Sequence, residues 1–572
     1  MQKGDTIHRG VPFFSLEVAG SRLSSEQQLH SPPAREKHLS IQSIDPPTLQ
    51  ALLASDSLHA CIDVRERGEF ARAQIAGTSP VNRGMLEIRL PVMVPDRRVP
   101  VVVCCDDGRR SALAAGTLAS MGYADVRILA GGIDEWRRQG LPVRSGWGVH
   151  GKEYGERVAH GGNVIHVSAV ELAQRRKAGE DVVVVDVRSR EEYLRGHVPD
   201  TYHIPGGNLL VDAPRLPLKD DTTLVVSCAG RTRGILGAQL LHDNGFTNVY
   251  ALENGVMGWF LAGGNIATGT GKEVPEAASA SRSAQIRQAT ETLASRERLR
   301  RCSRDDFRAA SESGETFYLL DVRLPEEYEA GHMPRSISLP LGQMALAHEN
   351  FLAVRAAPVF VVSDDDLRPV WAASLLRNLG FRNVAILDGG LQAWSAAGLE
   401  LQQGNPEPVV FGLAEAQAQA NFVDAPALQA HVGSSALALD VRSIGEYGFA
   451  HIPGTRWLPR GRLELDIARV APDRALPLAL VCDNAVRSTL AAGTLRQLGY
   501  NDVRVLQGGT RAWEGSGLAL EDGLEGTGVS TEDAQADFGH SVWHGALGKS
   551  REDMERYLSW EIDLVKDGEA AS

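Results

Sequence analysis

The fold is decided by the stretch DVVVVDVRSREEYLRGHVPD, residues 181–200. Residues 181–185 are mostly apolar and lead into Asp186, a pattern typical of a buried parallel strand. A short helix is expected next. A second apolar run, Leu224–Val226, then leads to Cys228 and to a segment with helical spacing. Alternation of buried strands and helices indicates an α/β unit with a mainly parallel sheet.

The same pattern occurs four times at constant spacing. The tripeptide Asp-Val-Arg is found at Asp63–Arg65, Asp186–Arg188, Asp321–Arg323 and Asp440–Arg442. Forty-two residues after each Asp, the chain has Cys105, Cys228, Ser363 and Cys482. Each of these is followed after five residues by an Arg (Arg110, Arg233, Arg368, Arg487) and after 31 residues by a Trp (Trp136, Trp259, Trp394, Trp513). Insertions fall only between the units, so the spacing marks a folded core that is repeated four times.

The repeats divide the chain into domains and connecting segments. The expected domains span residues 38–147, 160–266, 298–402 and 420–522. Residues 267–297 form a linker whose Ala/Ser/Glu/Arg-rich composition favours a solvated helix, and its length suggests a two-plus-two layout of the domains. Residues 1–37 are expected to be poorly ordered. Residues 523–572 form an amphipathic tail, which we expect to dock on a neighbouring domain rather than on a partner.

Length, composition and charge limit the classes of function. A chain of 572 residues is too long for one core. With 43% hydrophobic and 23% charged residues it has the composition of an ordinary globular protein. The net charge of −13 is spread along the chain and argues against general nucleic-acid binding.

The sequence shows no motif that indicates membrane insertion, secretion or the binding of a cofactor. No apolar run approaches the roughly 20 residues that span a bilayer, and the N-terminus lacks a signal-peptide core. We therefore expect a cytoplasmic protein without membrane partners, whose six cysteines remain thiols. No organic cofactor motif is found. His540 and His544 have helical spacing but no third ligand nearby, so no metal site is expected.

The repeated Cys or Ser of each unit lies in a polar loop between an expected strand and an expected helix. The loops read CDDGRRS (105–111), CAGRTRG (228–234), SDDDLRP (363–369) and CDNAVRS (482–488). The carboxyl end of a parallel sheet is where α/β proteins usually bind ligands. Free N–H groups of the loop and of the helix N-terminus form an anion cradle there, and a nearby Arg lowers a thiol pKa. Such a thiolate can attack an anionic sulfur compound and hold the transferred sulfur as a persulfide.

Charge distinguishes the four loops. The Cys228 loop has Arg231 and Arg233 and no acid, so it is predicted to be the best anion site, with the most stabilised thiolate. In the first unit two acids balance two arginines: Asp106 and Asp107 against Arg109 and Arg110. In the fourth unit one acid balances one arginine: Asp483 against Arg487. The first and fourth sites either act on a less charged donor or are idle.

The third unit is predicted to be inactive. Ser363 cannot form a persulfide, and the three acids Asp364–Asp366 outweigh Arg368 in its loop. A serine nucleophile would need an adjacent base, and the loop contains no His. Ser363 and Arg368 therefore define a degenerate site.

Together these residues resemble the rhodanese superfamily of sulfurtransferases. The matching residues of the second unit are Asp186–Arg188, Glu192-Tyr193, Gly196–Pro199, Ile204-Pro205, the Cys228 loop with Arg233, and Glu253–Gly255 to Trp259. Units three and four repeat the pattern at Glu327–Pro334 and Glu446–Gly454. The first unit has Gln74 in place of His but keeps Gly131-Gly132 and Trp136. The resemblance covers about 420 residues. It implies four tandem rhodanese-like domains, each a mainly parallel five-stranded sheet flanked by helices.

The resemblance also implies roles for particular residues. Cys228 would be the nucleophile that carries sulfane sulfur, with Cys105 and Cys482 as the corresponding candidates. The implied donor-binding residues are Arg233, Arg231, Gly230, Thr232, Arg110, Arg109 and Arg487. The donor would be thiosulfate, 3-mercaptopyruvate or a small persulfide, and the acceptor cyanide or a thiol, with a protein acceptor as a further candidate. Asp186, Arg188 and His197 are interpreted as scaffold, and no oligomeric state is implied.

Two other functions remain open at this stage. Some relatives of this fold hydrolyse phosphate esters through a Cys-x5-Arg loop. Every unit here has four residues between the Cys or Ser and the Arg, which makes a tighter cradle and favours sulfur transfer. The other alternative is a non-catalytic or relay protein, in which the repeats dock partners or pass sulfur between domains.

Overall fold

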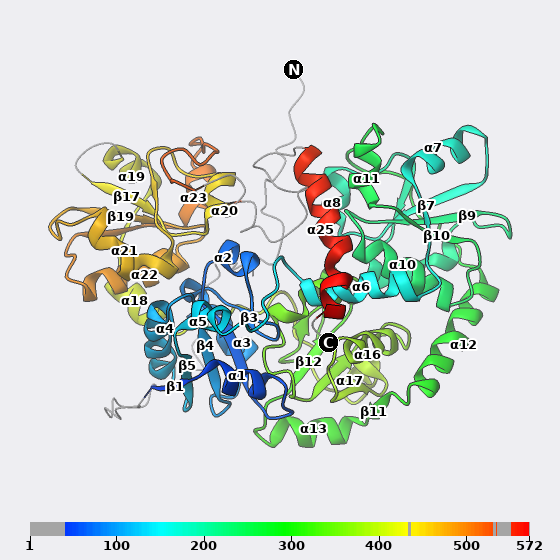
Figure 1. Ribbon diagram of the computed structural model, residues 1–572, viewed down its shortest axis with the longest axis horizontal. Helices are drawn as coiled ribbons and strands as arrows, with labels where there is room; N and C mark the ends of the chain where they lie inside the picture. Colours follow the sequence, from blue (N-terminus) through cyan, green and yellow to red (C-terminus); the bar gives the residue numbers. More distant parts are fainter. Residues whose placement is uncertain (1–40, 433–435, 530–533, 535–550, 571–572) are drawn as a thin grey trace.

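The computed structural model describes residues 41–432, 436–529, 534 and 551–570. In these residues, four five-stranded sheets follow one another along the chain, and helices surround each sheet (Figure 1). All four sheets have the same strand order, which in the first is β1-β5-β4-β2-β3, with every pairing parallel. The predicted fold class, four α/β units with mainly parallel five-stranded sheets, is thereby confirmed. The segment 1–37 and the pair His540 and His544 lie outside the described residues.

The strands are short, as in other α/β proteins. The first sheet comprises β1 (Gln42–Ile44), β2 (Ala60–Asp63), β3 (Ser79–Pro80), β4 (Val101–Cys104) and β5 (Val126–Leu129). The second comprises β6 (Ile165–Val167), β7 (Val182–Asp186), β8 (Thr201–His203), β9 (Thr223–Ser227) and β10 (Val249–Leu252). The third comprises β11 (Arg300–Cys302), β12 (Tyr318–Asp321), β13 (Ile337–Ser338), β14 (Val359–Val362) and β15 (Val384–Leu387). The fourth comprises β16 (Asn421–Val423), β17 (Leu437–Asp440), β18 (Arg456–Trp457), β19 (Leu478–Val481) and β20 (Val503–Leu506).

Helices connect these strands, and η denotes a 3₁₀ helix. The first unit has α1 (Pro46–Leu53), α2 (Arg67–Arg72), η1 (Arg83–Met85), α3 (Leu86–Met93), α4 (Arg109–Ser120) and α5 (Gly132–Arg138). The second has α6 (Val149–Gly161), α7 (Ala169–Lys177), α8 (Arg190–Arg195), η2 (Gly206–Asn208), α9 (Leu209–Asp212), η3 (Ala213–Arg215), α10 (Thr232–Asp243) and α11 (Gly255–Leu261). Helix α12 (Ala280–Arg296) precedes the third unit, with α13 (Arg304–Glu312), α14 (Pro325–Ala330), α15 (Leu341–Ala347), η4 (His348–Asn350), α16 (Arg368–Asn378) and α17 (Gly390–Ala396). The fourth has α18 (Leu413–Gln419), α19 (Ala425–His431), α20 (Ile444–Phe449), η5 (Arg460–Arg462), α21 (Leu463–Val470), α22 (Val486–Gln497) and α23 (Gly509–Gly515), and α25 (Arg551–Ala570) ends the described chain.

Each sheet is buried on both faces, because successive side chains of a strand point to opposite sides. In β7, Val183 and Val185 pack in one cluster with Leu241 of α10. Val184 packs in another cluster with Leu172 of α7. This double burial accounts for the continuous apolar run before Asp186.

The repeated Asp-Val-Arg tripeptide ends the second strand of each unit in a buried ion pair. In the second unit, Arg188 donates to both carboxylate oxygens of Asp186, over 2.9 and 2.7 Å. It also donates to the backbone oxygen of Gly196, over 2.6 Å. Both charged side chains are fully buried. The contacts tie the end of the strand to the end of α8.

The units form a row in the order fourth, first, third, second (Figure 1). The first and third units share one hydrophobic core, in which the Tyr318 hydroxyl donates to the backbone oxygen of Met93 over 2.5 Å. The first and fourth units meet at η1 and η5, where Arg460 and Glu87 form a buried ion pair. The third and second units meet at α15 and η2. The two-plus-two layout suggested by the linker is therefore wrong, because the shared core joins the units into a continuous row.

The linker helix α12 has one buried face. Ile286 lies in the core of the second unit, and Leu293 lies in the core that the first and third units share. Between them, the hydroxyl of Thr290 accepts a hydrogen bond from the indole of Trp371 over 3.0 Å. The helix therefore bridges two units instead of being solvated on all sides, since these three residues recur at helical spacing along one stripe.

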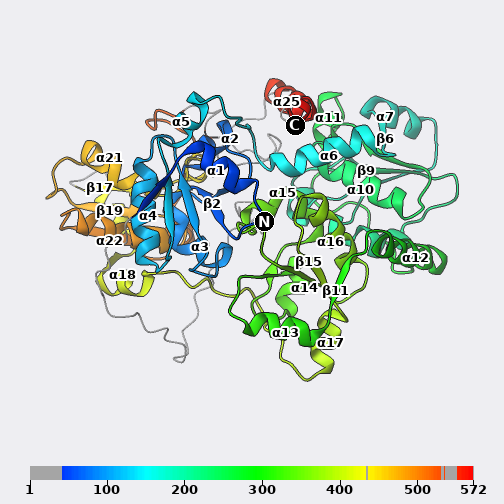
Figure 2. The ribbon, with the colours of Figure 1, turned by 60° about the horizontal axis from the view of Figure 1, so that its bottom comes forward.

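The C-terminal helix α25 packs against α6 and the second unit, as both views show (Figures 1 and 2). Its apolar residues Met554 and Leu558 are buried in the same cluster as Val256 and Met257 of α11. Among the helices described, none has the length and apolar character needed to cross a membrane.

Candidate active site

Cys228 lies one residue beyond the end of β9, in the loop that leads into α10. Its side chain is 3% exposed. Gly255, at the start of α11, packs against the backbone of this loop and has φ +55°. A Cβ there would lie 2.3 Å from the backbone oxygen of Cys228. Only glycine permits this approach, and Gly132, Gly390 and Gly509 make the corresponding contact in the other units.

Arg233 begins the cradle around Cys228 and is held by a carboxylate. It donates to both oxygens of Glu192, over 2.6 and 2.7 Å. The same Glu192 caps the start of α8 by accepting from the Ser189 amide over 3.1 Å. The corresponding pairs in the other units are Arg110–Glu69, Arg368–Glu327 and Arg487–Glu446, all 41 residues apart. The pair fixes the guanidinium group beside the loop in each unit.

Arg231 is also neutralised by a buried carboxylate. It donates to both oxygens of Glu156 on α6, each over 2.7 Å. A further contact joins it to the side-chain oxygen of Asn254 over 3.1 Å. The positive charge predicted for the Cys228 loop is therefore offset by Glu156 and Glu192, which the loop sequence does not contain.

The pocket above Cys228 is walled by distant parts of the chain. The loop residues Ala229, Gly230, Arg231, Thr232 and Arg233 line one side. The other walls come from α6, from α15–η4 of the third unit and from α25, through Lys152, Gln343, Leu346, Ala347, Asn350, Tyr557 and Glu561. The site is thus composite, since the third unit and the tail complete a pocket that the second unit begins.

Helix α25 contributes a carboxylate to this pocket. One oxygen of Glu561 accepts a hydrogen bond from the hydroxyl of Thr232 over 2.6 Å. Its other oxygen is buried and has no hydrogen-bond partner among the described residues. Lys152 of α6 lies beneath the helix, with its ammonium group 4.9 Å from the ring centre of Tyr557. Burial lowers the pKa of Lys152 to about 8, against the opposing charge of Glu561.

The thiol of Cys228 is protonated in this enclosed pocket. Burial raises its pKa to about 11; the Arg233 charge and the Gly234 amide oppose the shift, and Glu561 adds to it. Burial thus acts against the thiolate that the charges of the loop predict at Cys228, and the ranking of the sites by thiolate stability stays a prediction. The sequence-based reasoning counted the charges of the loop but neither the desolvation nor the carboxylate from α25.

The first unit places Cys105 in a well-formed but acid-filled cradle. Its sulfur accepts from the amides of Gly108 and Ser111, over 3.2 and 3.4 Å. Asp106, the next residue after Cys105, binds Arg110 over 2.5 Å. Arg109 is paired with Asp107 on the exposed side of the loop.

Cys104 belongs to the scaffold of the first unit. It packs with Cys61 in the cluster on one face of the sheet, whereas Cys105 lies in the cluster on the other face. The hydrogen bond with the neighbouring Cys61, together with burial, raises the pKa of the Cys104 thiol well above its usual value. Cys104 is thus poorly placed to resolve a persulfide on Cys105.

The fourth unit resembles the first. The sulfur of Cys482 lies 3.4 Å from the amide of Ser488 and 3.3 Å from its hydroxyl. Asp483 binds Arg487 over 2.7 Å. Burial, together with the charge of Asp483, raises the pKa of the Cys482 thiol.

The third unit fills its cradle with its own acids. The hydroxyl of Ser363 donates to Asp365 over 2.8 Å. Arg368 binds Asp365, Asp364 over 2.7 Å and Glu327 over 2.6 Å. Contact with Arg368 lowers the pKa of Asp365 although burial opposes it, so this carboxylate is a weak base for activating Ser363.

Sequence reasoning missed the carboxylates and the lysine that complete the Cys228 site. The constant separation of 41 residues between Glu192 and Arg233, repeated in all four units, could have revealed that pair. Glu156, Lys152 and Glu561 lie outside the repeats, so no internal comparison could reveal them. Their position depends on how α6 and α25 pack on the second unit.

Comparison with known proteins agrees with the repeated architecture. The family described as Rhodanese-like domain matches four segments, residues 45–139, 168–262, 303–397 and 424–516. A sulfurtransferase of Allochromatium vinosum is 33% identical over 103 residues, which are 18% of this chain and 94% of that protein. The thiosulfate sulfurtransferase GlpE of Pseudoalteromonas translucida is 35% identical over 83 residues, 14% of this chain and 77% of that protein.

A solved structure extends the similarity over nearly the whole molecule. The crystal structure of a thiosulfate sulfurtransferase from Pseudomonas aeruginosa superposes with a TM-score of 0.82 at 30% sequence identity. The match covers 93% of this chain and 98% of that one. With its four matched segments and four equivalent sheets, the chain belongs to the rhodanese-like family as a protein with four tandem rhodanese-like domains.

Proposed function

We propose that this protein is a sulfurtransferase that moves sulfane sulfur from thiosulfate or a related donor to cyanide or a thiol, through a persulfide on Cys228. The thiosulfate sulfurtransferases among its relatives support this class of reaction. The six buried free thiols support a reducing compartment, and we include a cytoplasmic location in the proposal.

One observation carries the choice of Cys228. In three units the residue after the Cys or Ser is an acid that binds the cradle arginine: Asp106 to Arg110, Asp364 to Arg368 and Asp483 to Arg487. In the second unit this residue is Ala229. Arg233 therefore lacks the internal acid that binds the other cradle arginines. It lines the pocket with Cys228 while donating to Glu192 and, over 3.4 Å, to the side-chain oxygen of Gln343, which supports its availability to a donor anion.

The chemistry follows from the positions of these groups. After losing its proton to water, the Cys228 sulfur attacks the outer sulfur of thiosulfate. The sulfur–sulfur bond of the donor breaks, and sulfite leaves with the bonding electron pair. Arg233, Lys152 and the loop amides stabilise the negative charge of the donor and of the departing sulfite. Cyanide then attacks the outer sulfur of the persulfide, so thiocyanate leaves and the Cys228 thiolate is restored.

The remaining thiols support a secondary role. Cys105 and Cys482 lie in cradles whose arginines are bound by Asp106 and Asp483. Because these acids already occupy the anion-binding arginines, we assign docking or relay functions to the first and fourth domains. A protein thiol is a candidate acceptor in such a relay. A phosphatase is disfavoured, because only four residues separate Cys228 from Arg233. The resulting loop encloses a smaller space than the Cys-x5-Arg loop that binds a phosphoryl group.

The proposal is tested by thiocyanate formation from thiosulfate and cyanide. Cys228→Ala is expected to abolish turnover, whereas Cys482→Ala, the matched change in an acid-filled cradle, is expected to retain most of it. Equal loss in both variants, or turnover that survives Cys228→Ala, would contradict the assignment of Cys228.

A further inference from the structure

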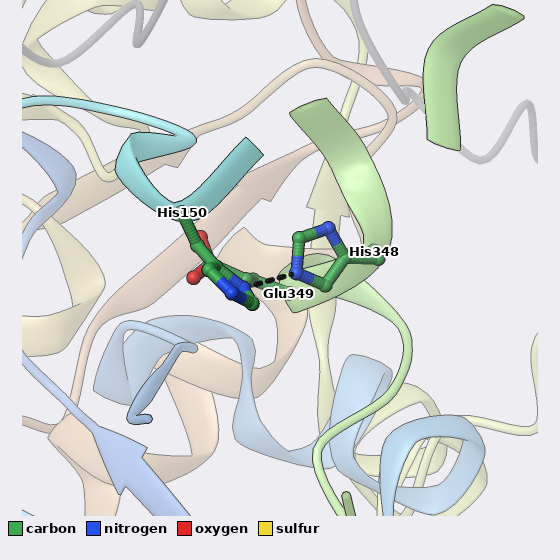
Figure 3. Close-up of side chains that lie close together, drawn as sticks. All are labelled: His150, His348 and Glu349. Carbon is green, nitrogen blue, oxygen red and sulfur yellow. Dashed lines mark hydrogen bonds between the residues drawn. The ribbon is translucent and has the colours of Figure 1, made fainter. Parts of the chain in front are cut away.

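A cluster of three metal-ligand side chains lies between the second and third units, outside the Cys228 pocket. It consists of His150 in the first turn of α6, and His348 and Glu349 in η4 (Figure 3). The candidate ligand atoms all lie within 4.8 Å of one another. Nδ1 of His150 is 3.2 Å from Nε2 of His348.

The orientation of His348 is fixed by the backbone. Its Nδ1 lies 3.2 Å from the oxygen of Met344 and 3.1 Å from the oxygen of Ala345. Nδ1 must carry the proton to donate to these carbonyl groups, so Nε2 presents a lone pair toward His150. Histidines that bind metal ions usually donate their second ring N–H to a carbonyl or carboxylate in this way.

The glycines that flank His150 bring α6 onto α15. A Cβ at Gly151 would lie 1.8 Å from the backbone oxygen of Ala345. Gly148 has φ +53°, and a Cβ there would lie 3.2 Å from the backbone oxygen of Leu346. The two backbones therefore meet at a distance that only glycine allows, and this places His150 opposite His348.

We propose that His150, His348 and Glu349 bind one divalent transition-metal ion of the zinc class, with water as the fourth ligand. Two ligand atoms that are each about 2.0–2.1 Å from a tetrahedral zinc ion lie roughly 3.3 Å apart. The two imidazole nitrogens already have this separation. Two imidazoles and one carboxylate are a donor set that zinc accepts in proteins.

The protonation states of the cluster agree with this set of ligands. Burial lowers the pKa of His150 to about 2 and that of His348 to about 3, so both rings are neutral, the form that binds metal ions. Burial raises the pKa of Glu349 to about 7, despite the charges of Arg355 and Arg144.

The site would hold together two walls of the Cys228 pocket. Lys152, two residues after His150, lines the pocket from α6. Ala347 and Asn350, which flank the other two ligands, line it from the third unit. A metal ion here would cross-link the second and third units and fix the shape of the pocket without contacting the reacting sulfur.

The test is zinc binding by the full chain after treatment with a chelator, in competition with a chromophoric zinc indicator. We expect one zinc ion per chain, with affinity reduced by more than about tenfold in His348→Gln and in Glu349→Gln. The double variant His540→Ala/His544→Ala, which removes two histidines that lie four residues apart in the sequence, should bind zinc like the wild type. Cobalt substituted at the site should give the intense visible absorption of a tetrahedral ion.

Two outcomes would overturn the proposal. One is a wild-type chain that binds no zinc at micromolar concentrations, so that the cluster is a hydrogen-bonded pair of neutral imidazoles only. The other is zinc binding that is unchanged in His348→Gln and Glu349→Gln, which would assign the ion to another site, such as the cysteines. Thermal unfolding adds a readout that does not depend on competition, because zinc should raise the Tm of the wild type and not of His348→Gln.

Discussion

Glu561 of α25 accepts a hydrogen bond from Thr232 in the Cys228 loop over 2.6 Å, across 329 residues of sequence. The contact brings the end of the described chain onto the loop of the proposed nucleophile. It also places a carboxylate, one oxygen of which has no hydrogen-bond partner in the described part of the chain, beside a thiol whose pKa is raised. Helix α25 therefore borders the proposed nucleophile as well as packing against the second unit.

Glu561→Gln should lower the pKa of Cys228, because the charge of Glu561 opposes formation of the thiolate. The expected result is faster alkylation of Cys228 by iodoacetamide at neutral pH, with the pH profile displaced to lower pH. Peptide mass spectrometry can follow the alkylation at this residue. Glu555→Gln, an exposed change on the same helix, is the matched control and should leave the profile unaltered.

The rate at which wild-type Cys228 reacts should rise with pH through the neutral range. The folded protein holds the thiol protonated up to a pKa of about 11, above its ordinary value of 9.0. The thiolate fraction therefore increases about tenfold for each pH unit below that value. A rate that levels off near pH 7 would show that the loop stabilises the thiolate after all.

Arg233→Ala should impair both sulfur transfer and stability. The variant loses the cation proposed to bind the donor. It also breaks the buried ion pair between Arg233 and Glu192, which typically costs about 3–5 kcal/mol of unfolding free energy. Urea unfolding measures the second effect and thiocyanate formation the first. The double variant Arg233→Ala/Glu192→Gln should recover part of the stability and none of the activity. Recovery of activity would show that Arg233 acts only as scaffold.

Ala229→Asp should convert the second site into a copy of the acid-filled cradles of the other three units. The new carboxylate would occupy the position from which Asp106, Asp364 and Asp483 bind their arginines. We expect kcat/KM for thiosulfate to fall by more than about tenfold, since the donor must compete with an internal anion. Asp364→Ala, the reverse change in the third domain, should leave the activity as it is.

The four-domain fold could be predicted from the sequence because every unit keeps the same spacing from Asp to Cys to Trp. The side chains that carry this spacing make the same contacts each time, as Trp136 and Trp259 do by donating to backbone oxygens six residues ahead. The loop residues of the site could be predicted for the same reason. The order of the units and the side chains that complete the Cys228 pocket could not be predicted, because they depend on contacts between units.

Glu156, Lys152 and Glu561 belong to segments without a counterpart in the repeats. Only the packing of α6 and α25 brings them to Cys228. The row of units was also hidden, since it depends on a shared core around Tyr318 and not on the length of a linker. Desolvation then reversed the expected shift of the Cys228 pKa.

The most direct test of the account is the intact mass of the protein after brief exposure to thiosulfate and removal of the excess, for the wild type and for Cys228→Ala, Cys105→Ala and Cys482→Ala. We predict a gain of one sulfur, about 32 Da, that cyanide discharges as thiocyanate and that is lost only in Cys228→Ala. A gain that persists in Cys228→Ala, or that disappears in Cys105→Ala or Cys482→Ala, would contradict the assignment of the persulfide to the second domain.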